Sequence, residues 1–401
     1  MSSPALSVAF VYDDSLDRHG GIPQYLATLG RGLVSRGHRV SYLVGSSSID
    51  RLGTGEVHSL ARNVDVRFNG SCGTMPLLSR RRDIDKALSG RAFDVVHVQV
   101  PYSPFLAARV IHRLDPAVAV VGTFHVNSEL ALPRAGARLL ATMTRRSLRR
   151  FDEMMCVSEV AAGFARRWFG LTDTRLVPNM VDGGALRSMA TMRHPWSSTE
   201  PHVVFVGNLV PRKGVETLLE AMPAIVAAHA DARLTIAGAG PLRAHLERLV
   251  RNRDLETYVR FAGSISEAEK ATLLGSADIA CFPSRYGESF GIVLLEAIAA
   301  GANVVVAGRN AAYAEVLRET PTALANPDDA DDLARTMLRF LAEPDLRHHV
   351  AARQRRVAAR HDLEIVVDRV LGVYSAALRR RRSPQPVSLQ VPTQDLECQP
   401  S

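Results

Sequence analysis

Cysteine is scarce in this sequence, and the four cysteines lie far apart. They stand at positions 72, 156, 281 and 398, so no two of them form a CxxC pair. Zinc sites and disulfide frameworks need closely spaced or numerous cysteines. We therefore expect neither, and the sparse cysteines favour a reducing compartment, the cytoplasm.

Long apolar runs are also missing. A membrane-spanning helix needs about 18 or more consecutive apolar residues, and no run in the sequence approaches that length. The short run Val8–Val11 has no basic leader and is followed by Tyr12 and Asp13. We expect a first β-strand there and not a signal peptide. With 46% hydrophobic and 22% charged residues, the composition is that of a globular protein.

Lysine is nearly absent, although the net charge is +8. Only Lys86, Lys213 and Lys270 interrupt an otherwise all-arginine set of 49 basic residues. The arginine excess is typical of a GC-rich coding bias, so each lysine merits attention. A basic chain favours anionic partners such as nucleotides or phospholipid head groups. Nucleic acid is not expected, because no aromatic residues are interleaved with the arginines to stack on bases.

Strand and helix patterns alternate in the first half of the chain. Short β-branched runs predict strands at Ser7–Tyr12, Arg39–Val44, Asp94–Val98, Ala117–Gly122 and Glu153–Val157. Helical stretches lie between them, at Gln24–Ser35, Pro104–Arg113 and Arg138–Arg150. Such alternation is typical of βαβ units and a parallel sheet.

The alternation breaks once and then resumes. Residues 178–201 are rich in Asn, Gly, Ser and Pro, and a second α/β series starts at His202–Gly207 and becomes helical after Asp328. We predict two doubly wound, Rossmann-like domains, over 1–182 and 201–362, with a linker over 183–200. A helix over about 363–380 is expected to pack back on the first domain, and 381–401 to be a disordered tail. Ligands of doubly wound sheets lie beyond the carboxyl ends of the strands, so we expect the domains to face each other across one cleft.

The stretch PSRYGESFGIVLLEAIAAG at 283–301 carries the strongest signal. A strand ends at Phe282, Glu288 lies in the following loop, and Glu296 lies on the next helix, which we expect to start near Phe290. The amides of Ser289, Phe290 and Gly291 at such a helix start suit a phosphate or a sugar hydroxyl. The alternative is that Glu288 caps the helix and Glu296 is a solvated or paired acid.

A second motif, GNLVPRKG, follows the first strand of the second half. Gly207 allows a turn beneath a ligand, and Arg212 with Lys213 can neutralise a diphosphate. Fixed cations lower the barrier to departure of a nucleoside diphosphate, whose negative charge grows as it leaves. The alternative is a surface lysine at a helix start. The turn at 238–241, GAGP, is too common a pattern to be assigned a role.

Two weaker features follow strands of the first half. Gly20 and Gly21 precede a helix and allow close approach of a substrate, and Pro23 fits the first helical turn. His125 follows an apolar strand and can donate to a sugar hydroxyl or orient an acceptor. Each also has a structural interpretation, a plain turn or a core histidine.

These motifs resemble glycosyltransferase family 4, the retaining enzymes of the GT-B fold. The resemblance covers nearly all of residues 5–375 and is carried by ESFGIVLLEAIAAG, GNLVPRKG, PNMVD at 178–182, TFH at 123–125 and SEAEKATLLGSADIACFP at 266–283. Within the family, the sequence is most similar to the actinobacterial phosphatidylinositol mannosyltransferase group.

The resemblance implies a role for each motif. Glu288 is expected to contact hydroxyls of the donor sugar and Glu296 the ribose, while the intervening amides hold sugar and phosphate. Gly20, Gly21 and His125 are expected on the acceptor side, with Gly21 also near the donor diphosphate. Two positions depart from the family pattern: Asn208 stands where arginine is usual, and Pro23 where glutamine is usual.

The activity implied is transfer of mannose or another hexose from a nucleoside-diphosphate sugar, such as GDP-mannose, to a lipid or glycan hydroxyl. The catalytic set would be His125, Lys213 and Glu288, and the leaving phosphate would take the acceptor proton. No DxD pair lies in a plausible donor loop, so we expect no obligatory metal or other cofactor. The alternatives are a sugar-nucleotide epimerase of the same fold and an inactive relative that only binds the nucleotide sugar.

A basic stripe on one helix raises the question of membrane binding. Arg134, Arg138, Arg145 and Arg149 share one face of the helix predicted near 138–150. Such a face can meet anionic lipid, peripherally on the inner side of the plasma membrane. The alternative is an ordinary solvated face.

Overall fold

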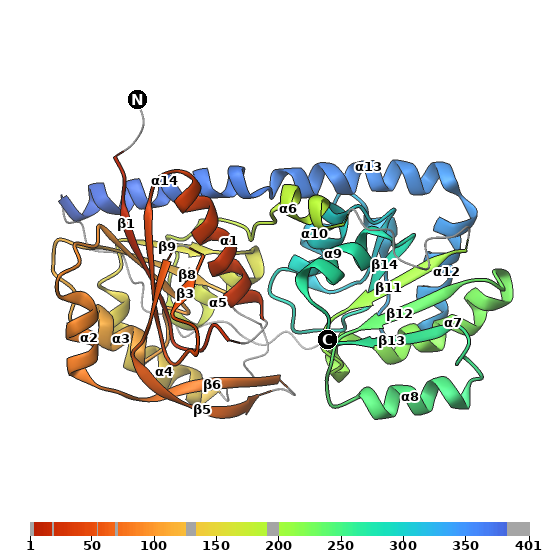
Figure 1. Cartoon of the computed structure of the whole chain (residues 1–401), viewed down its shortest axis with the longest axis horizontal. Coiled ribbons are helices and arrows are strands. Elements are labelled where there is room, and N and C mark those ends of the chain that lie inside the picture. The colour runs from red at the N-terminus through yellow and green to blue at the C-terminus, as the bar shows by residue number, and fades with distance from the viewer. Residues whose placement is uncertain are drawn as a thin grey trace. The chain divides into compact units, whose positions relative to one another are not determined.

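The structure is a computed structural model that describes residues 4–17, 20–53, 55–68, 71–125, 134–190 and 200–382. The chain forms two compact α/β units (Figure 1). Unit 1 comprises Met1–Val66, Gly73–Pro178 and Val367–Ser401, and unit 2 comprises Arg67–Cys72 and Asn179–Val366.

Unit 1 is built on an eight-stranded sheet. Its strands are β1 (Ser7–Tyr12), β2 (Arg39–Val44), β3 (Arg51–Leu52), β4 (Gly55–Ser59), β7 (Val95–Gln99), β8 (Ala119–Phe124), β9 (Glu153–Cys156) and β10 (Arg175–Leu176). Their order is β10-β9-β8-β7-β1-β2-β4-β3, and every pair is parallel except β3 with β4. The chain moves outward from β1 through β2 and then returns to the other side of β1 at β7. The switch point of this sheet therefore lies between β1 and β7.

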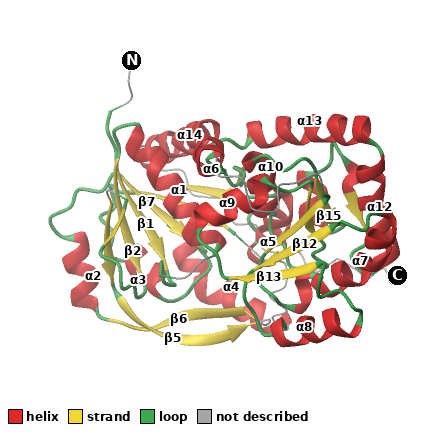
Figure 2. Ribbon diagram, turned by 45° about the vertical axis from the view of Figure 1, so that its right-hand side comes forward, coloured by secondary structure: helices red, strands yellow, loops and turns green. Residues whose placement is uncertain are grey.

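Helices flank this sheet (Figures 1 and 2). They are α1 (Gly21–Ser35), α2 (Arg81–Leu88), α3 (Leu106–Ile111), α4 (Arg134–Leu148), α5 (Glu159–Phe169) and α14 (Leu363–Arg382). The strands β5 (Ala61–Phe68) and β6 (Ser71–Ser79) form a separate two-stranded sheet. All six residues of β1 are buried, as is expected of a central parallel strand covered on both faces.

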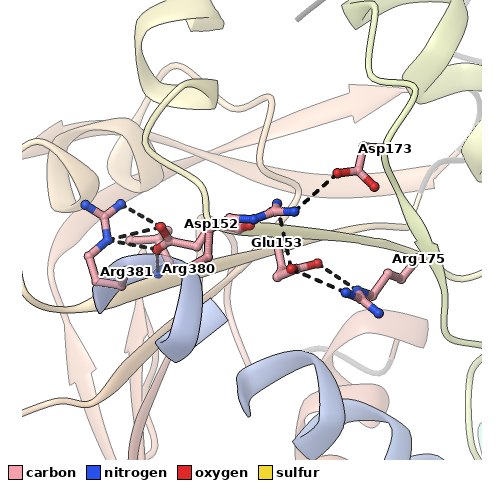
Figure 3. A network of polar contacts seen from close by, with 7 residues as sticks. Asp152, Glu153, Asp173, Arg175, Arg380 and Arg381 are labelled. Carbon is pink, nitrogen blue, oxygen red and sulfur yellow. Dashed lines mark hydrogen bonds and ion pairs between the residues drawn. The ribbon is translucent and has the colours of Figure 1, made fainter. Parts of the chain in front are cut away.

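The C-terminal helix α14 is tied to unit 1 by polar contacts along its length. Asp368 pairs with Arg36 at 2.9 Å, and the Tyr374 hydroxyl is 2.8 Å from Nδ1 of the buried His97. At its end, Arg381 donates to the carboxylate of Asp152 just before β9 (Figure 3). The helix is thus part of the core of the first unit although it comes last in the chain.

Unit 2 is built on a six-stranded, fully parallel sheet. Its strands are β11 (His202–Val206), β12 (Arg233–Ala237), β13 (Val259–Gly263), β14 (Ile279–Phe282), β15 (Val305–Gly308) and β16 (Leu324–Ala325). They lie in the order β13-β12-β11-β14-β15-β16. The chain runs outward from β11 through β12 to β13 and returns to the other side at β14. The switch point of the second sheet lies between β11 and β14.

Two groups of helices pack in unit 2. The helices of this unit are α6 (Gly183–Met189), α7 (Val215–Ala228), α8 (Arg243–Asn252), α9 (Glu267–Gly275), α10 (Ile292–Ala300), α11 (Ala311–Val316), α12 (Ala330–Ala342) and α13 (Pro344–Arg360). Helix α7 packs on α8 and α12, whereas α10 packs on α6, α9 and α13. Helix α10 is almost wholly apolar, IVLLEAIAA, and seven of its nine residues are buried. Its single charged residue, Glu296, therefore needs a partner.

Several sequence expectations need correction. Residues 183–189 were expected in the linker but form α6, because the side chain of Asp182 caps the helix at the amide of Ala185 and Leu186 is buried. The expected tail begins too early, since Arg381 and Arg382 belong to α14. Strands β7 and β8 end one and two residues later than expected, at Gln99 and Phe124. Residues 191–199 and 383–401 lie outside the described part of the chain.

The structure bears on the lack of long apolar runs and on the scarcity of cysteine. In the part of the chain that the structure describes, no helix combines the length and apolar character needed to cross a membrane. Cys156 and Cys281 are buried free thiols; the side chains of the other two cysteines lie outside the described residues.

Candidate functional site

Two loops meet at the switch point of the second sheet. One follows β11 and contains the short 3-10 helix Pro211–Lys213; the other follows β14 and spans 283–291. The amide of Arg285 donates to the carbonyl of Arg212 at 2.8 Å. Gly214 has φ +67°, and a side chain there would overlap the Pro283 carbonyl. The glycine therefore lets the backbones of the two loops approach closely.

Glu288 lies between the two cations of the first loop. Lys213 Nζ donates to Glu288 Oε1 at 2.6 Å, and Arg212 donates to the same oxygen at 3.1 Å. The three side chains are only 12–14% exposed. Burial alone would raise the pKa of the Glu288 carboxyl, but the charges of Lys213 and Arg212 outweigh it and hold that pKa below its ordinary value. Two cations and one carboxylate leave this cluster with a net positive charge.

A buried tyrosine on α11 packs against the loop that carries Glu288. The Tyr313 hydroxyl is 3.1 Å from the hydroxyl of Ser284, and Asn310 donates to the Ser284 carbonyl at 2.9 Å. Gly291 has φ +100°, and a Cβ there would lie 2.7 Å from the Tyr313 ring. Burial raises the pKa of Tyr313 well above its ordinary value, and the nearby Glu288 charge acts in the same direction. The phenol therefore stays neutral and acts as a fixed support.

Glu296 belongs to a second ion pair. It lies on α10, is 3% exposed, and accepts from Lys270 of α9 at 2.9 Å. Lys270 also pairs with Glu267 at 2.8 Å. Burial alone would lower the pKa of Lys270, but the carboxylates of Glu296 and Glu267 outweigh it and raise that pKa. Two of the three lysines thus each pair with one glutamate of the 288–296 motif.

The remaining residues of this motif lie at the start of α10. The helix begins at Ile292, two residues later than expected, and Gly291 is its N-cap. Phe290 is 4% exposed, with its ring centroid 5.6 Å from that of His361. Its side chain is therefore part of the core, and only its backbone can face a ligand. Ser289, directly before it, is half-buried.

The GAG turn after β12 has a structural role. Side chains at Gly238 and Gly240 would overlap the backbone of Gly207 and Leu209, and Leu209 donates its amide to the Ala239 carbonyl at 2.9 Å. The glycines let the loop after β12 pack directly on the loop after β11. They thereby help to position the loop that carries Lys213.

In unit 1, the glycine pair lies at the start of α1. Gly21 is the first helical residue and Gly20 precedes it in extended conformation. Both are exposed. A Cβ at Gly21 would meet no atom within 4 Å. Packing within the described residues thus gives no reason for glycine at this position.

His125 lies directly after β8, beside the last residue of β7. Its Nε2 is 2.7 Å from Oε1 of Gln99, and the edge of Tyr25 packs on the imidazole at a centroid distance of 4.7 Å. The His125 side chain is half-buried, and burial lowers its pKa to about 3. The ring is therefore neutral at physiological pH.

Gln99 was missed by the sequence analysis. The signal that could have found it is the pair of spacings HxQ at 97–99 and TxH at 123–125, because residues two apart on a strand share one face of the sheet. In the structure His97 bonds Thr123 at 2.6 Å, one step before the Gln99–His125 pair.

Asp13, at the end of β1, serves the fold. It accepts the amide of Ala107 at 2.8 Å and the hydroxyl of Ser103, which fixes the start of α3. Burial raises the pKa of its carboxyl to about 6, against the lowering effect of these hydrogen bonds. Among the described residues, no group of three or more His, Cys, Asp and Glu is placed to hold a metal ion.

The basic stripe lies on α4. Arg145 and Arg149 are exposed there, together with Leu139 and Met143, which are 63% and 58% exposed. Arg134 and Arg138 belong to the same helix, but their side chains lie outside the described residues. The described part of α4 therefore exposes basic and large apolar side chains on two neighbouring faces.

Comparison with known proteins gives two family matches. Residues 191–357 match the model described as glycosyl transferases group 1, and residues 19–183 match glycosyltransferase family 4. The phosphatidyl-myo-inositol mannosyltransferase of Propionibacterium freudenreichii is 32% identical over 392 residues, covering 93% of this chain and 95% of that protein. The enzyme of the same name from Mycolicibacterium smegmatis is 30% identical over 378 residues, covering 92% and 93%.

Solved structures share the fold at lower identity. A glycosyltransferase from Rickettsia africae has a TM-score of 0.72 at 16% identity, covering 94% of this chain and 100% of its own. Anabaena HepE, solved in complex with UDP and glucose, also has a TM-score of 0.72 at 16% identity, covering 92% and 100%. At this identity the likeness shows the GT-B fold alone.

Proposed function

Because the chain belongs to glycosyltransferase family 4, we propose that it transfers mannose from GDP-mannose to a phosphatidylinositol-type lipid with retention of anomeric configuration. The donor and the acceptor follow the printed names of its relatives, among them a GDP-mannose-dependent alpha-(1-6)-phosphatidylinositol dimannoside mannosyltransferase of Mycobacterium tuberculosis, 30% identical over 84% of this chain and 88% of that protein. Another hexose on another nucleotide remains the competing donor class.

The observation that carries the proposal is the cluster of Lys213, Arg212 and Glu288 at the switch point of unit 2. Open α/β sheets bind ligands there, and the net positive charge of the cluster suits a diphosphate. Cations fixed before the reaction stabilise the charge that grows on the leaving group. Because its pKa is lowered, Glu288 is ionised at neutral pH and can accept hydrogen bonds from sugar hydroxyls.

The other donor contacts follow from the second ion pair. Glu296 would accept from a ribose, and Lys270 would hold the carboxylate in place and neutralise it in its buried position. The amides of Ser289, Phe290 and Gly291 at the start of α10 would serve sugar and phosphate. No metal or other cofactor enters this scheme, because the side-chain cations serve the diphosphate.

In unit 1, the acceptor hydroxyl would contact Gly20, Gly21 and His125. With its pKa lowered to about 3, His125 is too weak a base to take the proton of the acceptor hydroxyl, so the leaving phosphate would take that proton. Glu288, Lys213 and His125 are thus the proposed catalytic set. Asn208 lies in the same loop as Lys213 and carries no charge, so Arg212 would be the second diphosphate cation.

The direct test is an assay of the full chain with GDP-mannose and phosphatidylinositol vesicles, with UDP-glucose, ADP- and TDP-sugars in parallel and EDTA in a further arm. We expect a mannosylated lipid whose anomeric configuration by NMR matches the donor, formed in the presence of EDTA. Lys213→Ala should slow transfer by about 100-fold or more, whereas Lys86→Ala should not. Free or epimerised sugar formed without lipid would identify an epimerase, and nucleotide binding without turnover an inactive relative.

We also propose that α4 brings the enzyme to an anionic membrane, on the cytoplasmic side. The support is that α4 exposes Leu139 and Met143 on the face adjoining that of Arg145 and Arg149, since apolar insertion and charge attraction add up at a lipid surface.

Co-sedimentation with phosphatidylcholine vesicles, with and without phosphatidylglycerol, tests this. Binding should need the anionic lipid, weaken with salt, and be lost in Arg145→Glu/Arg149→Glu and in Leu139→Ser/Met143→Ser. Arg355→Glu/Arg356→Glu, the same charge change on exposed positions of α13, is the control. Equal binding of neutral vesicles, or full binding by the α4 variants, would overturn this part.

A further inference from the structure

We propose that Gln99 is a positioning residue that holds His125 in the tautomer protonated at Nε2, so that Nδ1 is left to accept a hydrogen bond from a substrate hydroxyl. That this hydroxyl belongs to the lipid acceptor rests on the proposed function. The tautomer itself does not.

The topology of the sheet brings the two residues together. β7 and β8 are parallel neighbours in which Gln99 is paired with Thr123, and His125 lies two residues further along, on the same face as Thr123. The preceding step on this face is the bond between His97 and Thr123. Gln99 and His125 therefore form the outermost polar pair, at the carboxyl end of the sheet, where ligands of such sheets bind.

The direction of the hydrogen bond decides the tautomer. The carboxamide oxygen of Gln99 can only accept, so Nε2 of His125, 2.7 Å away, must carry the proton. A neutral imidazole has one N–H, and its Nδ1 then has a free lone pair. An acceptor nitrogen can hold a neighbouring hydroxyl of the acceptor molecule by a hydrogen bond, and it thereby positions the attacking hydroxyl, whose own proton passes to the leaving phosphate.

The surroundings leave the ring little freedom. Tyr25, which is 5% exposed, lies edge-on against the imidazole at an interplanar angle of 72°. Gln99 itself is 0% exposed. A buried amide that bonds His125 on one side and a ring that packs on the other fix both the position and the rotation of the imidazole.

A second observation points to a ligand at this place. The amide nitrogen of Gln99 is buried and has no hydrogen-bond partner among the residues that the structure describes. A buried donor without a partner is destabilising, and a polar ligand group beside His125 would satisfy it. The same side chain would then orient His125 with its oxygen and contact the ligand with its nitrogen.

The test is ¹⁵N NMR of the full chain labelled at histidine, which reports directly which ring nitrogen carries the proton. In the wild type we expect His125 as the Nε2–H form. Gln99→Leu removes the acceptor and should give a mixture of tautomers. Gln99→Glu keeps an acceptor oxygen and should restore the Nε2–H form.

Kinetics give the second readout. Gln99→Leu should raise KM for the lipid acceptor about tenfold and leave the dissociation constant of GDP within about twofold, because a lost positioning contact of this kind is worth a single hydrogen bond. Gln354→Leu is the matched control. Gln354 is also a buried amide, 1% exposed, but both its ends bond the backbone of Val305 in unit 2, at 2.9 and 2.8 Å.

Three results would overturn the inference: an Nδ1–H tautomer in the wild type, an unchanged tautomer in Gln99→Leu, or an equal change in Gln354→Leu. If Gln99→Leu fails to fold, the wild type and Gln99→Glu still decide. If no glycosyl transfer is found, the proposed function fails while the tautomer measurement stands by itself.

Discussion

At Glu288, two opposing effects act on one carboxyl group. Burial favours the protonated form, while the nearby charges of Lys213 and Arg212 favour the ionised form and prevail. The carboxylate therefore neutralises part of the charge that a diphosphate would use. Donor binding and sugar contact compete for the same two cations.

This competition predicts opposite effects on binding and on turnover. Glu288→Gln keeps the shape of the side chain and removes its charge. We expect GDP to bind about two- to fivefold more tightly, because both cations are released, while the transfer rate falls by about 100-fold. Calorimetry and the lipid assay measure the two quantities. Glu267→Gln, at the exposed partner of Lys270, is the control, and weaker GDP binding by Glu288→Gln would contradict the argument.

Gly291 has a left-handed backbone conformation and lies close to the ring of Tyr313. A side chain at this position should lower the free energy of unfolding for both reasons. Gly291→Ala places a Cβ 2.7 Å from the Tyr313 ring, at φ +100°, and should lower the free energy of unfolding by about 2–4 kcal/mol. Gly301 has a similar φ of +111° but open space around its Cβ. Gly301→Ala should therefore cost about 1 kcal/mol, and equal losses in urea unfolding would show that the contact with Tyr313 does not matter.

The lowered pKa of His97 predicts that the stability of the fold depends on pH. Burial, and to a lesser degree the charge of His125, lowers its pKa to about 3, whereas in the unfolded chain it titrates near 6.5. Below pH 6.5 the unfolded state binds a proton at this histidine that the folded state cannot bind. The free energy of unfolding therefore decreases as the pH falls from 6.5 toward 3. The slope is about 1.4 kcal/mol per pH unit.

Urea unfolding at several pH values measures the effect. Between pH 6.5 and 4.5, the wild type should lose about 2 kcal/mol more than His97→Gln. His349→Gln, on an exposed helix surface, controls for the loss of one histidine. Parallel curves for the wild type and His97→Gln would show that His97 does not supply the slope.

Helix α14 packs with a buried apolar face, and its last turn is also held by ion pairs. Figure 3 shows Arg381 reaching Asp152, while Arg380 lies between Glu153 and Asp173. Arg381 contacts the Asp152 carboxylate at 2.6 and 3.0 Å, and Asp152 is 4% exposed. A carboxylate buried at the start of β9 thus holds the last turn of the helix.

Removing that charge should loosen the helix end. Asp152→Asn can still accept the Val120 amide but leaves Arg381 without its counter-charge, so we expect a loss of about 1–3 kcal/mol, with faster hydrogen exchange at 376–382. Asp173→Asn is the control, because Asp173 is 63% exposed and 3.5 Å from Arg380; it should cost less than about 0.5 kcal/mol. Equal effects of the two changes would mean that burial of Asp152 is unimportant.

At the scale of the whole molecule, the residues proposed for the donor lie in unit 2 and those proposed for the acceptor lie in unit 1. GDP should therefore slow hydrogen exchange at 207–214 and 283–296. At about 100 times its dissociation constant it should add about 2.7 kcal/mol to the stability of unit 2. Lys213→Ala should reduce both effects. Protection by GDP confined to unit 1 would reverse the assignment of the two units.

Local sequence patterns are enough to predict the fold class and to select the loops of the candidate site. Strands β1 and β2 have the bounds that their local patterns predict, and α1 ends at Ser35 as predicted, since apolar periodicity acts within a few positions. The loops at 207–214 and 283–291 could be chosen because each follows a strand of a parallel sheet.

Which side chains meet depends on the three-dimensional fold. Lys213 and Glu288 are 75 positions apart, Gln99 and His125 are 26 apart, and Arg381 and Asp152 are 229 apart. Strand order and register set these pairings, and neither is encoded in the local pattern of any one strand. The helix in the expected linker and the buried partner of Glu296 were missed for the same reason: each depends on the energy of packing against elements that are distant in the chain.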